Sequence, residues 1–154
     1  MRTVNLRPEL LPPPVSQQRL DELSREIDRI ADLLADHSEE ADEAIRRFNA
    51  RTGHAYVAYD FAEYYGSRSL DEFAREAARP ARPRVADITR DELVEIVRRL
   101  LAADPEGDYY LRLLEANVPH PGVSDLVFHP SGGIQHASAE KIVNAALNYR
   151  PIAL

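Results

Sequence analysis

The sequence contains no cysteine and no tryptophan, and its 154 residues include a single methionine. Because it has no thiol, the chain can form neither a disulfide framework nor a thiolate metal site. No apolar run approaches the roughly 18 residues that a membrane-spanning helix needs. The opening "MRTVNLRPEL" also lacks the apolar core of a signal peptide. We therefore expect a cytoplasmic protein.

The motifs of common enzyme sites are absent as well. The sequence has no glycine-rich phosphate loop and no HExxH zinc motif. Ser124 and Ser138 have histidines nearby, but neither serine follows a strand in the way that exposes a nucleophile. The sequence thus predicts a protein that is not an enzyme, with no catalytic residues and no cofactor.

Basic side chains are in the minority. The chain has 26 acidic and 19 basic residues and a formal net charge of −7. Such a chain is repelled by DNA, RNA and anionic membranes, so we expect no nucleic acid and no membrane as a partner. A basic protein is the natural complement.

What the sequence does contain is helical periodicity, which follows a proline-rich start. The prolines of "LRPELLPPPVS" predict an extended arm over 1–15 that is flexible unless it docks. After the arm, apolar positions alternate at spacings of three and four, which predicts one long amphipathic helix over 16–51. These positions are Leu20, Leu23, Ile27, Ile30, Leu34, His37, Ala41, Ala44 and Phe48. The stripe either packs within the chain or pairs with a second copy, so a homodimer through this helix stays open.

Three shorter signals follow the stripe. Gly53 predicts the end of the long helix, because glycine readily adopts the left-handed conformation of a C-cap. The segment 59–66 predicts a short helix rich in aromatic residues. In "SLDE", Ser69 and Glu72 have the spacing of a capping box, which predicts a third helix ending near Ala78.

A break in the pattern follows at 79–84, where "RPARPR" has two prolines and no apolar anchor. This composition is typical of a linker. The sequence therefore predicts three parts: a flexible arm at 1–15, an N-terminal helical region at 16–84 and a C-terminal domain at 85–154.

The C-terminal domain contains only helical patterns. Thr89 and Glu92 form a second capping box, and the stripe of the helix that follows consists of Leu93, Ile96, Val97, Leu100 and Leu101. "DPEG" at 104–107 predicts a turn, 108–118 a second helix, and Ser138 the start of a last helix. No alternating strand pattern occurs anywhere in the sequence. The predicted fold class is all-α.

Between these helices, the segment "HPGVSDLVFHP" at 120–130 concentrates distinctive side chains. His120, Asp125 and His129 are residue types that bind metal ions. A structural zinc site also needs a fourth ligand and hydrogen bonds that orient the ligands, and no nearby residue is an obvious candidate. We therefore expect no metal here.

The acidic residues next to this segment allow two interpretations. The stretch 104–115 has four acidic residues and a single basic residue, Arg112. The acidic residues are Asp104, Glu106, Asp108 and Glu115. They could form an ordinary solvated helix face. Alternatively, together with the aromatic residue of the segment, they form an acidic rim around an aromatic anchor, the arrangement by which a protein surface binds a basic partner.

At this point the sequence resembles a known family. The stretches "DITRDELVEIVRRLLAAD", "YLRLLEANVPHPGVSDLVFHP" and "SAEKIVNAALNYR" are similar, in this order, to the first, second and last helices of the immunity proteins of nuclease bacteriocins. These proteins protect against E-group colicins and S-type pyocins with DNase activity. The middle stretch includes the counterpart of the family signature HPxxSDLIYYP. The resemblance covers 85–150, about 66 of the 154 residues.

The resemblance implies a distorted four-helix bundle of the colicin immunity type with a very short third helix, preceded in this chain by a long helix and two short ones. Family members bind the nuclease domain of the toxin beside its active site and block DNA by bulk and by negative charge. Their second helix selects the toxin, and their third helix supplies a shared contact. Carried over by position, the selecting residues are Asp108, Leu111, Arg112 and Glu115, and the shared contact is Ser124, Asp125, Phe128, His129 and Pro130.

The chain departs from the family pattern in three places. The family usually has paired tyrosines at the positions of Phe128 and His129, its loop between the first two helices is longer, and its small members have no counterpart of 1–84. We expect a bacteriocin immunity protein that inhibits the nuclease domain of a cognate toxin. The alternative is a helical interaction or scaffold protein that keeps the immunity fold but serves another partner, possibly as a dimer through the 20–48 heptads.

Overall fold

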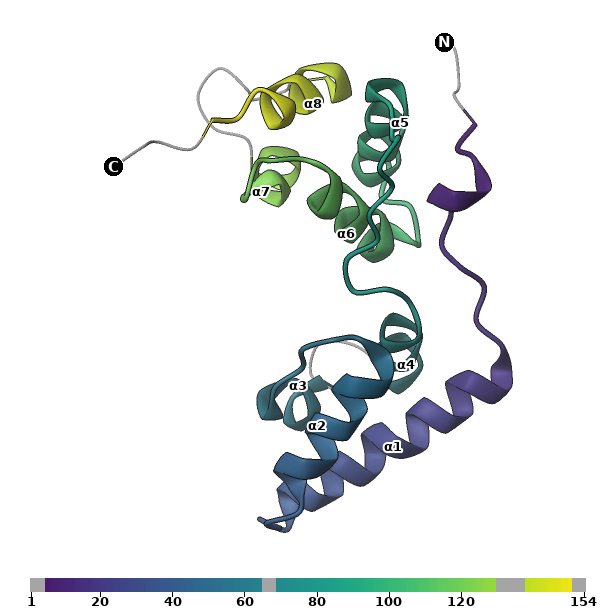
Figure 1. Ribbon diagram of the computed structural model, residues 1–154, viewed down its shortest axis with the longest axis vertical. Coiled ribbons are helices and arrows are strands. Elements are labelled where there is room, and N and C mark those ends of the chain that lie inside the picture. Colours follow the sequence, from purple (N-terminus) through teal and green to yellow (C-terminus); the bar gives the residue numbers. More distant parts are fainter. Residues whose placement is uncertain (1–4, 65–68, 130–137, 151–154) are drawn as a thin grey trace. The chain divides into compact units, whose positions relative to one another are not determined.

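The computed structural model of the protein describes residues 5–64, 69–129 and 138–150, and every regular element in these ranges is a helix (Figure 1). The all-α prediction is therefore confirmed. The chain forms two compact units: an N-terminal unit, Pro13–Ala81, and a C-terminal unit that combines Met1–Pro12 with Arg82–Leu154. No helix within the described ranges is long and apolar enough to cross a membrane.

The N-terminal unit contains α1 (Gln17–Ala35), α2 (Ala41–Thr52), α3 (Ala58–Ala62) and α4 (Leu70–Ala78). The prediction of one helix over 16–51 is wrong, because the chain turns between α1 and α2. His37 has a left-handed φ of 54°. The amide of His37 donates to the carbonyl of Leu34 and the amide of Ser38 to that of Leu33, the two bonds of a Schellman motif.

The core of the N-terminal unit is aromatic. Phe48, Phe61 and Phe73 are fully buried, and the ring centroid of Phe61 lies 5.4 Å from that of Phe48 and 5.3 Å from that of Phe73. The first four positions of the predicted heptad stripe, Leu20, Leu23, Ile27 and Ile30, are buried in the same cluster. These four positions of the stripe thus pack within the chain, which was one of the two alternatives; the other was pairing with a second copy.

Helix ends in this unit follow the local sequence signals. Gly53 caps α2 with a φ of 76°, and the side chain of Ser69 accepts a hydrogen bond from the amide of Glu72 at 3.1 Å. The predicted helix ending near Ala78 is therefore confirmed. The predicted short helix at 59–66 corresponds to α3, which ends at Ala62. Residues 65 and 66 of the predicted segment lie outside the described ranges.

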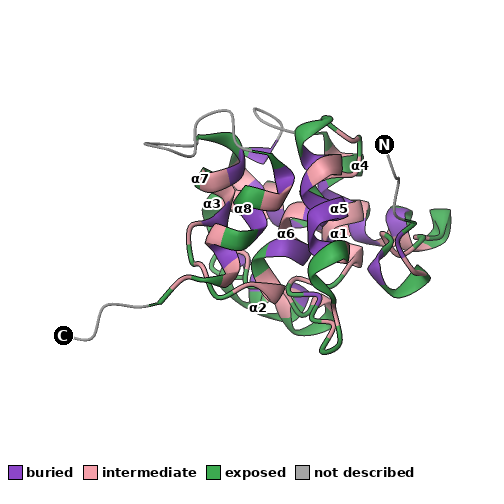
Figure 2. Cartoon of the chain, turned by 90° about the horizontal axis from the view of Figure 1, so that it is seen from above, coloured by how far each residue is buried: buried purple, intermediate pink, exposed green. Residues whose placement is uncertain are grey.

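The C-terminal unit contains α5 (Arg90–Leu101), α6 (Gly107–Asn117), α7 (Val123–Phe128) and α8 (Ala139–Leu147). Helix α5 is central, since it packs against each of the other three, and Figure 2 shows how much of it is buried. Thr89 and Glu92 form the predicted capping box at its start. Leu101 was predicted to join the apolar stripe of α5, but it is 47% exposed because α5 ends there.

The N-terminal arm is docked rather than free. A 3-10 turn, η1 (Pro8–Leu10), places Leu10 in the core of the C-terminal unit with 0% of its surface exposed. Arg7 forms ion pairs with Asp87 at 2.8 Å and with Glu92 at 2.9 Å. The hydrogen bond from Arg7 lowers the pKa of Asp87. The sequence predicted a flexible arm unless it docked, and the structure gives the docked case for residues 6–10.

The predicted linker at 79–84 is divided between the two units. Arg79 donates to the carbonyl of Pro13 at 3.0 Å, within the N-terminal unit. In the C-terminal unit, Asn117 donates to the carbonyl of Pro83 at 2.9 Å and accepts from the amide of Val85 at 2.9 Å. Hydrogen bonds between side chains and the backbone therefore hold parts of a segment whose composition suggested freedom, and the N-terminal unit ends within this segment, at Ala81.

The turn after α5 predicts a stabilising substitution. Ala103 has a left-handed φ of 56°, and its amide and that of Asp104 close a Schellman motif. A left-handed conformation costs a residue with a Cβ about 1–2 kcal/mol, so Ala103→Gly should raise the stability of the C-terminal unit by about 1 kcal/mol in urea unfolding. Ala102→Gly is the matched control, because Ala102 has φ −84° and gains nothing from glycine. Equal destabilisation by both substitutions would contradict the prediction.

Candidate protein-contact surface

Helix α7 is held by two inward residues and presents a different set outward. Val123 and Val127 are buried in the core of the C-terminal unit, and Leu126 packs partly against it. Phe128 is 48% exposed. Asp125 and His129 are exposed and Ser124 is half-buried. Two buried valines therefore anchor the short helix, and Asp125, Phe128 and His129 are exposed to solvent.

The corner before α7 explains one of the two histidines. Nδ1 of His120 accepts a hydrogen bond from the amide of Gly122 at 2.9 Å. The His120 ring also packs on the ring of Tyr149, with 4.8 Å between centroids. His120 thus fixes the chain where it enters α7. No group of three or more metal-binding side chains occurs in the described part of the chain.

Helix α6 lies beside α7 and carries the other four predicted residues. Asp108 and Glu115 are exposed, whereas Leu111 and Arg112 are half-buried, and Leu111 packs against the core. Spacings of three and four residues place all four along one side of the helix. The structure thus brings seven of the nine predicted residues onto two neighbouring helices and places an eighth, His129, at the C-cap of α7; the ninth, Pro130, lies outside the described residues.

Three carboxylates are exposed on these two helices. Asp108, Glu115 and Asp125 form no ion pair within the described ranges, and the only basic side chain on either helix is Arg112. Exposed carboxylates and an exposed phenylalanine on two neighbouring helices combine negative charge with apolar area. We refer to Asp108, Glu115, Asp125 and Phe128 as the acidic surface.

Two basic residues of the unit, Arg98 and Arg99, lie on α5 and are paired there. Glu95 is buried and accepts a hydrogen bond from Arg99 at 3.0 Å, while Arg98 pairs with Glu140. Arg99 also donates to the hydroxyl of Tyr110 at 2.8 Å. Burial would lower the pKa of Arg99, but its hydrogen bonds to Glu95 and Tyr110 outweigh burial and raise it. Sequence reasoning missed Glu95, although its position among the apolar residues of α5 was an available signal.

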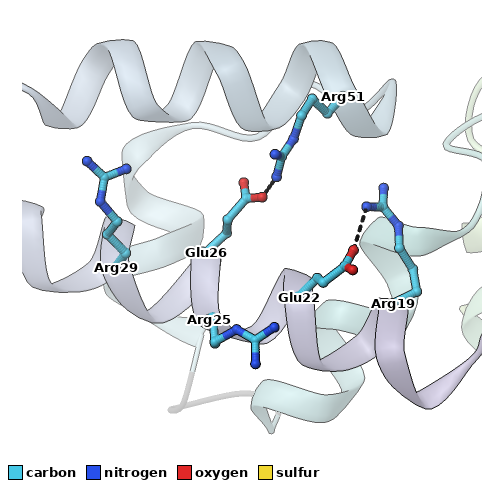
Figure 3. Close-up of a pocket in the computed structure, with 6 residues that line it drawn as sticks. All are labelled: Arg19, Glu22, Arg25, Glu26, Arg29 and Arg51. Atoms are coloured by element: carbon cyan, nitrogen blue, oxygen red, sulfur yellow. Dashed lines mark ion pairs between the residues drawn. The ribbon is translucent and has the colours of Figure 1, made fainter.

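The N-terminal unit has an arginine-lined hollow with a volume of about 310 Å³. Figure 3 shows its side chains, five from α1 and one from α2: Arg19, Glu22, Arg25, Glu26, Arg29 and Arg51. Arg19 pairs with Glu22 at 3.7 Å, and Arg51 pairs with Glu26 across the two helices. Because its two carboxylates neutralise two of the four guanidinium groups, we interpret this hollow as an ion-paired seam between helices.

Comparison with known proteins yields one family and one relative. Residues 85–151 match the model of the family described as colicin immunity protein / pyocin immunity protein. A protein of Bacillus subtilis (strain 168), named Uncharacterized protein YezA, is 39% identical over 66 residues, which are 41% of this chain and 93% of that protein. No solved structure matches the chain.

The matched residues coincide with a complete structural part of the molecule. They begin just before α5, include α6 and α7, and end after α8. The signature at 120–130 that carried the resemblance begins after α6, at the corner around His120, and includes the whole of α7. Through these residues, the chain belongs to the family of colicin and pyocin immunity proteins.

Proposed function

We propose that this protein binds the nuclease domain of a cognate bacteriocin toxin through the acidic surface and inhibits it without catalysis. Membership of the immunity-protein family supports a bacteriocin toxin as the partner. The observation that carries the finer proposal is the composition of α6 and α7, two helices in contact that expose three carboxylates and a phenylalanine. A nuclease grips DNA with basic residues, so such a surface is complementary to it.

Inhibition follows from charge and bulk. Residues 85–154 have ten acidic and six basic side chains, so the attraction between the two proteins extends beyond direct contact. A bound immunity protein would repel the phosphates of DNA and occupy space beside the nuclease active site. The phenyl ring of Phe128 would lose its water on binding, which slows dissociation. Charge thus governs association, and the ring governs how long the complex lasts.

Phe128→Ala tests the aromatic part of this proposal. We expect affinity for the purified nuclease domain encoded beside this gene to fall by about 30-fold or more, the effect of removing a central interface residue. The measurement is the dissociation rate in a surface-binding assay. Leu101→Ala is the matched control, since Leu101 is 47% exposed in the same unit but lies at the end of α5. If both variants bind like the wild type, Phe128 is not part of the contact.

Asp125→Asn tests the electrostatic part. Asp125 lies in the first turn of α7, and Asp91 lies in the first turn of α5, so Asp91→Asn removes an equivalent charge elsewhere. We expect Asp125→Asn to reduce the association rate and its dependence on salt more than Asp91→Asn does. Equal effects of the two substitutions would mean that only the net charge matters and that the toxin does not contact α7.

The alternative function, a dimeric scaffold, loses its proposed surface. The positions that would pair two copies, among them Leu23, Ile27 and Phe48, are buried within the N-terminal unit. A dimer through them would require that unit to open. No observation favours this alternative over toxin binding.

A further inference from the structure

The N-terminal unit exposes an apolar segment where α3 begins. Val57 is 60% exposed and Tyr59 is 72% exposed, the largest fractions among the big hydrophobic side chains of the described residues. Ala55 and Ala58 are exposed as well. Four apolar side chains within five residues therefore face solvent together. Contiguous exposed apolar area of this kind is typical of a binding surface.

The segment is held firmly from both sides. The side-chain amide of Asn49 donates to the carbonyl of Tyr56 at 2.8 Å, and its oxygen accepts from the Tyr56 amide at 3.0 Å. The hydroxyl of Tyr56 donates to Glu76 at 2.6 Å. One residue further on, the amide of Val57 donates to Asp60 at 2.8 Å. A contact segment that is already ordered loses little conformational entropy on binding.

Tyr59 does not contribute to the fold in the way the neighbouring tyrosines do. The Tyr56 ring lies 5.0 Å from the Phe73 ring, and the hydroxyl of Tyr64 donates to Asp28 at 3.0 Å. Within the described residues, the Tyr59 side chain has neither a hydrogen bond nor a ring contact, and the Tyr59 carbonyl accepts from the amide of Glu63 at 3.0 Å. The backbone around Tyr59 is therefore stabilised by other residues, while its own ring is left available.

The charges around this segment indicate the chemistry of a partner. Glu63 is exposed and follows Tyr59 by four residues, which places both on one side of α3. The N-terminal unit as a whole has fifteen acidic and nine basic side chains, a formal net charge of −6. An apolar contact beside an exposed carboxylate, on a unit of net negative charge, complements a basic protein. The acidic surface on α6 and α7 has the same character.

We propose that Val57 and Tyr59 form a second toxin-contact site, on the N-terminal unit, for the same basic nuclease domain. This inference rests on the proposed function, which supplies the basic partner. Two contact sites on one chain raise each other's local concentration, so the second adds affinity even when it is weak alone. It gives the N-terminal unit a role that the family resemblance does not cover.

The test uses the full-length chain with Tyr59→Ala, alone and combined with Phe128→Ala. We expect Tyr59→Ala to weaken binding to the purified nuclease domain by about 10-fold, mainly through faster dissociation. Tyr59→Phe is the matched control and should retain affinity, because the ring and not the hydroxyl makes the contact. Hydrogen–deuterium exchange of α1–α4 should be unchanged in both variants, since the Tyr59 side chain is exposed.

The outcomes separate this proposal from the function on which it rests. If Phe128→Ala weakens binding while Tyr59→Ala does not, the second site is wrong and the first stands. If the wild type does not bind the nuclease at all, both proposals are wrong. If Tyr59→Ala instead converts a dimer into a monomer without changing toxin affinity, the occupant is a second copy and the proposal is overturned.

Discussion

Leu10→Ala is expected to destabilise the C-terminal unit by about 2–5 kcal/mol, the range for removing a buried leucine side chain. Leu10 has no exposed surface and belongs to the same core as Leu93 and Val97 of α5. The cost should lie toward the upper part of this range if the 3-10 turn cannot collapse into the space. Because net stabilities of proteins are about 5–15 kcal/mol, one substitution in the arm would remove a large fraction of the total.

The control for this experiment is the next residue along the chain. Leu11 is 38% exposed, so Leu11→Ala removes the same atoms from a site that is partly in water. Hydrogen–deuterium exchange of α5–α8 measures the effect within the C-terminal unit alone. A loss of protection in Leu10→Ala that Leu11→Ala does not reproduce would support the docked arm. Equal protection in both variants would mean that the arm does not contribute to this core.

The docked arm also shows where sequence reasoning reached its limit. Its prolines indicate an extended chain, whereas Pro8–Leu10 form a 3-10 turn, and Leu6 and Leu10 contact a core formed by residues more than eighty positions away. No local pattern encodes such a contact. The family resemblance gave no help, because it begins at residue 85. By contrast, the N-caps at Ser69 and Thr89 and the C-terminal helices depend on neighbouring residues, and those predictions were accurate. At Ser69 only half of the predicted capping box forms, because the side chain of Glu72 accepts from the Ser69 hydroxyl and not from the Ser69 amide.

The turn between α1 and α2 was not predicted, for a different reason. Alternating spacings of three and four continue through His37 and Ala41, so periodicity alone favours one helix. The left-handed residue of the Schellman motif is His37 instead of glycine, which hides the helix end. The available signal was "DHSEE" at 36–40, a run of five residues without an apolar side chain. Turn chemistry should therefore outweigh weak apolar positions such as Ala44.

The sequence predicted which side chains of α7 face outward better than it predicted the exposure of the site residues on α6. The helical spacing of Val123 and Val127, which face the core, is enough to place Asp125 and Phe128 on the outward side. Arg112 and Leu111 are half-buried because α6 packs on both α5 and α7, and such packing depends on helices that are distant in sequence. A helix face can be read from spacing, but the exposure of residues at its edge cannot.

Phe48→Ala is expected to destabilise the N-terminal unit by about 3–5 kcal/mol, the range for a buried phenylalanine. The Phe48 ring makes edge contacts with the rings of Phe61 and Phe73, so its removal leaves a cavity at the centre of the aromatic cluster. Protection against hydrogen–deuterium exchange should fall in α1–α4. The matched control is Tyr59→Ala, which also removes an aromatic ring from this unit but one that is 72% exposed.

Phe48→Ala also separates the contributions of the two units to toxin binding. Because the aromatic cluster lies wholly in the N-terminal unit, the acidic surface on α6 and α7 should keep its structure in Phe48→Ala. If Val57 and Tyr59 bind the toxin, Phe48→Ala should weaken binding at least as much as Tyr59→Ala, since it removes the support of the whole segment. Adding Tyr59→Ala to Phe48→Ala should then cost little more. Full additivity of the two losses would instead place the effect of Phe48 outside this segment.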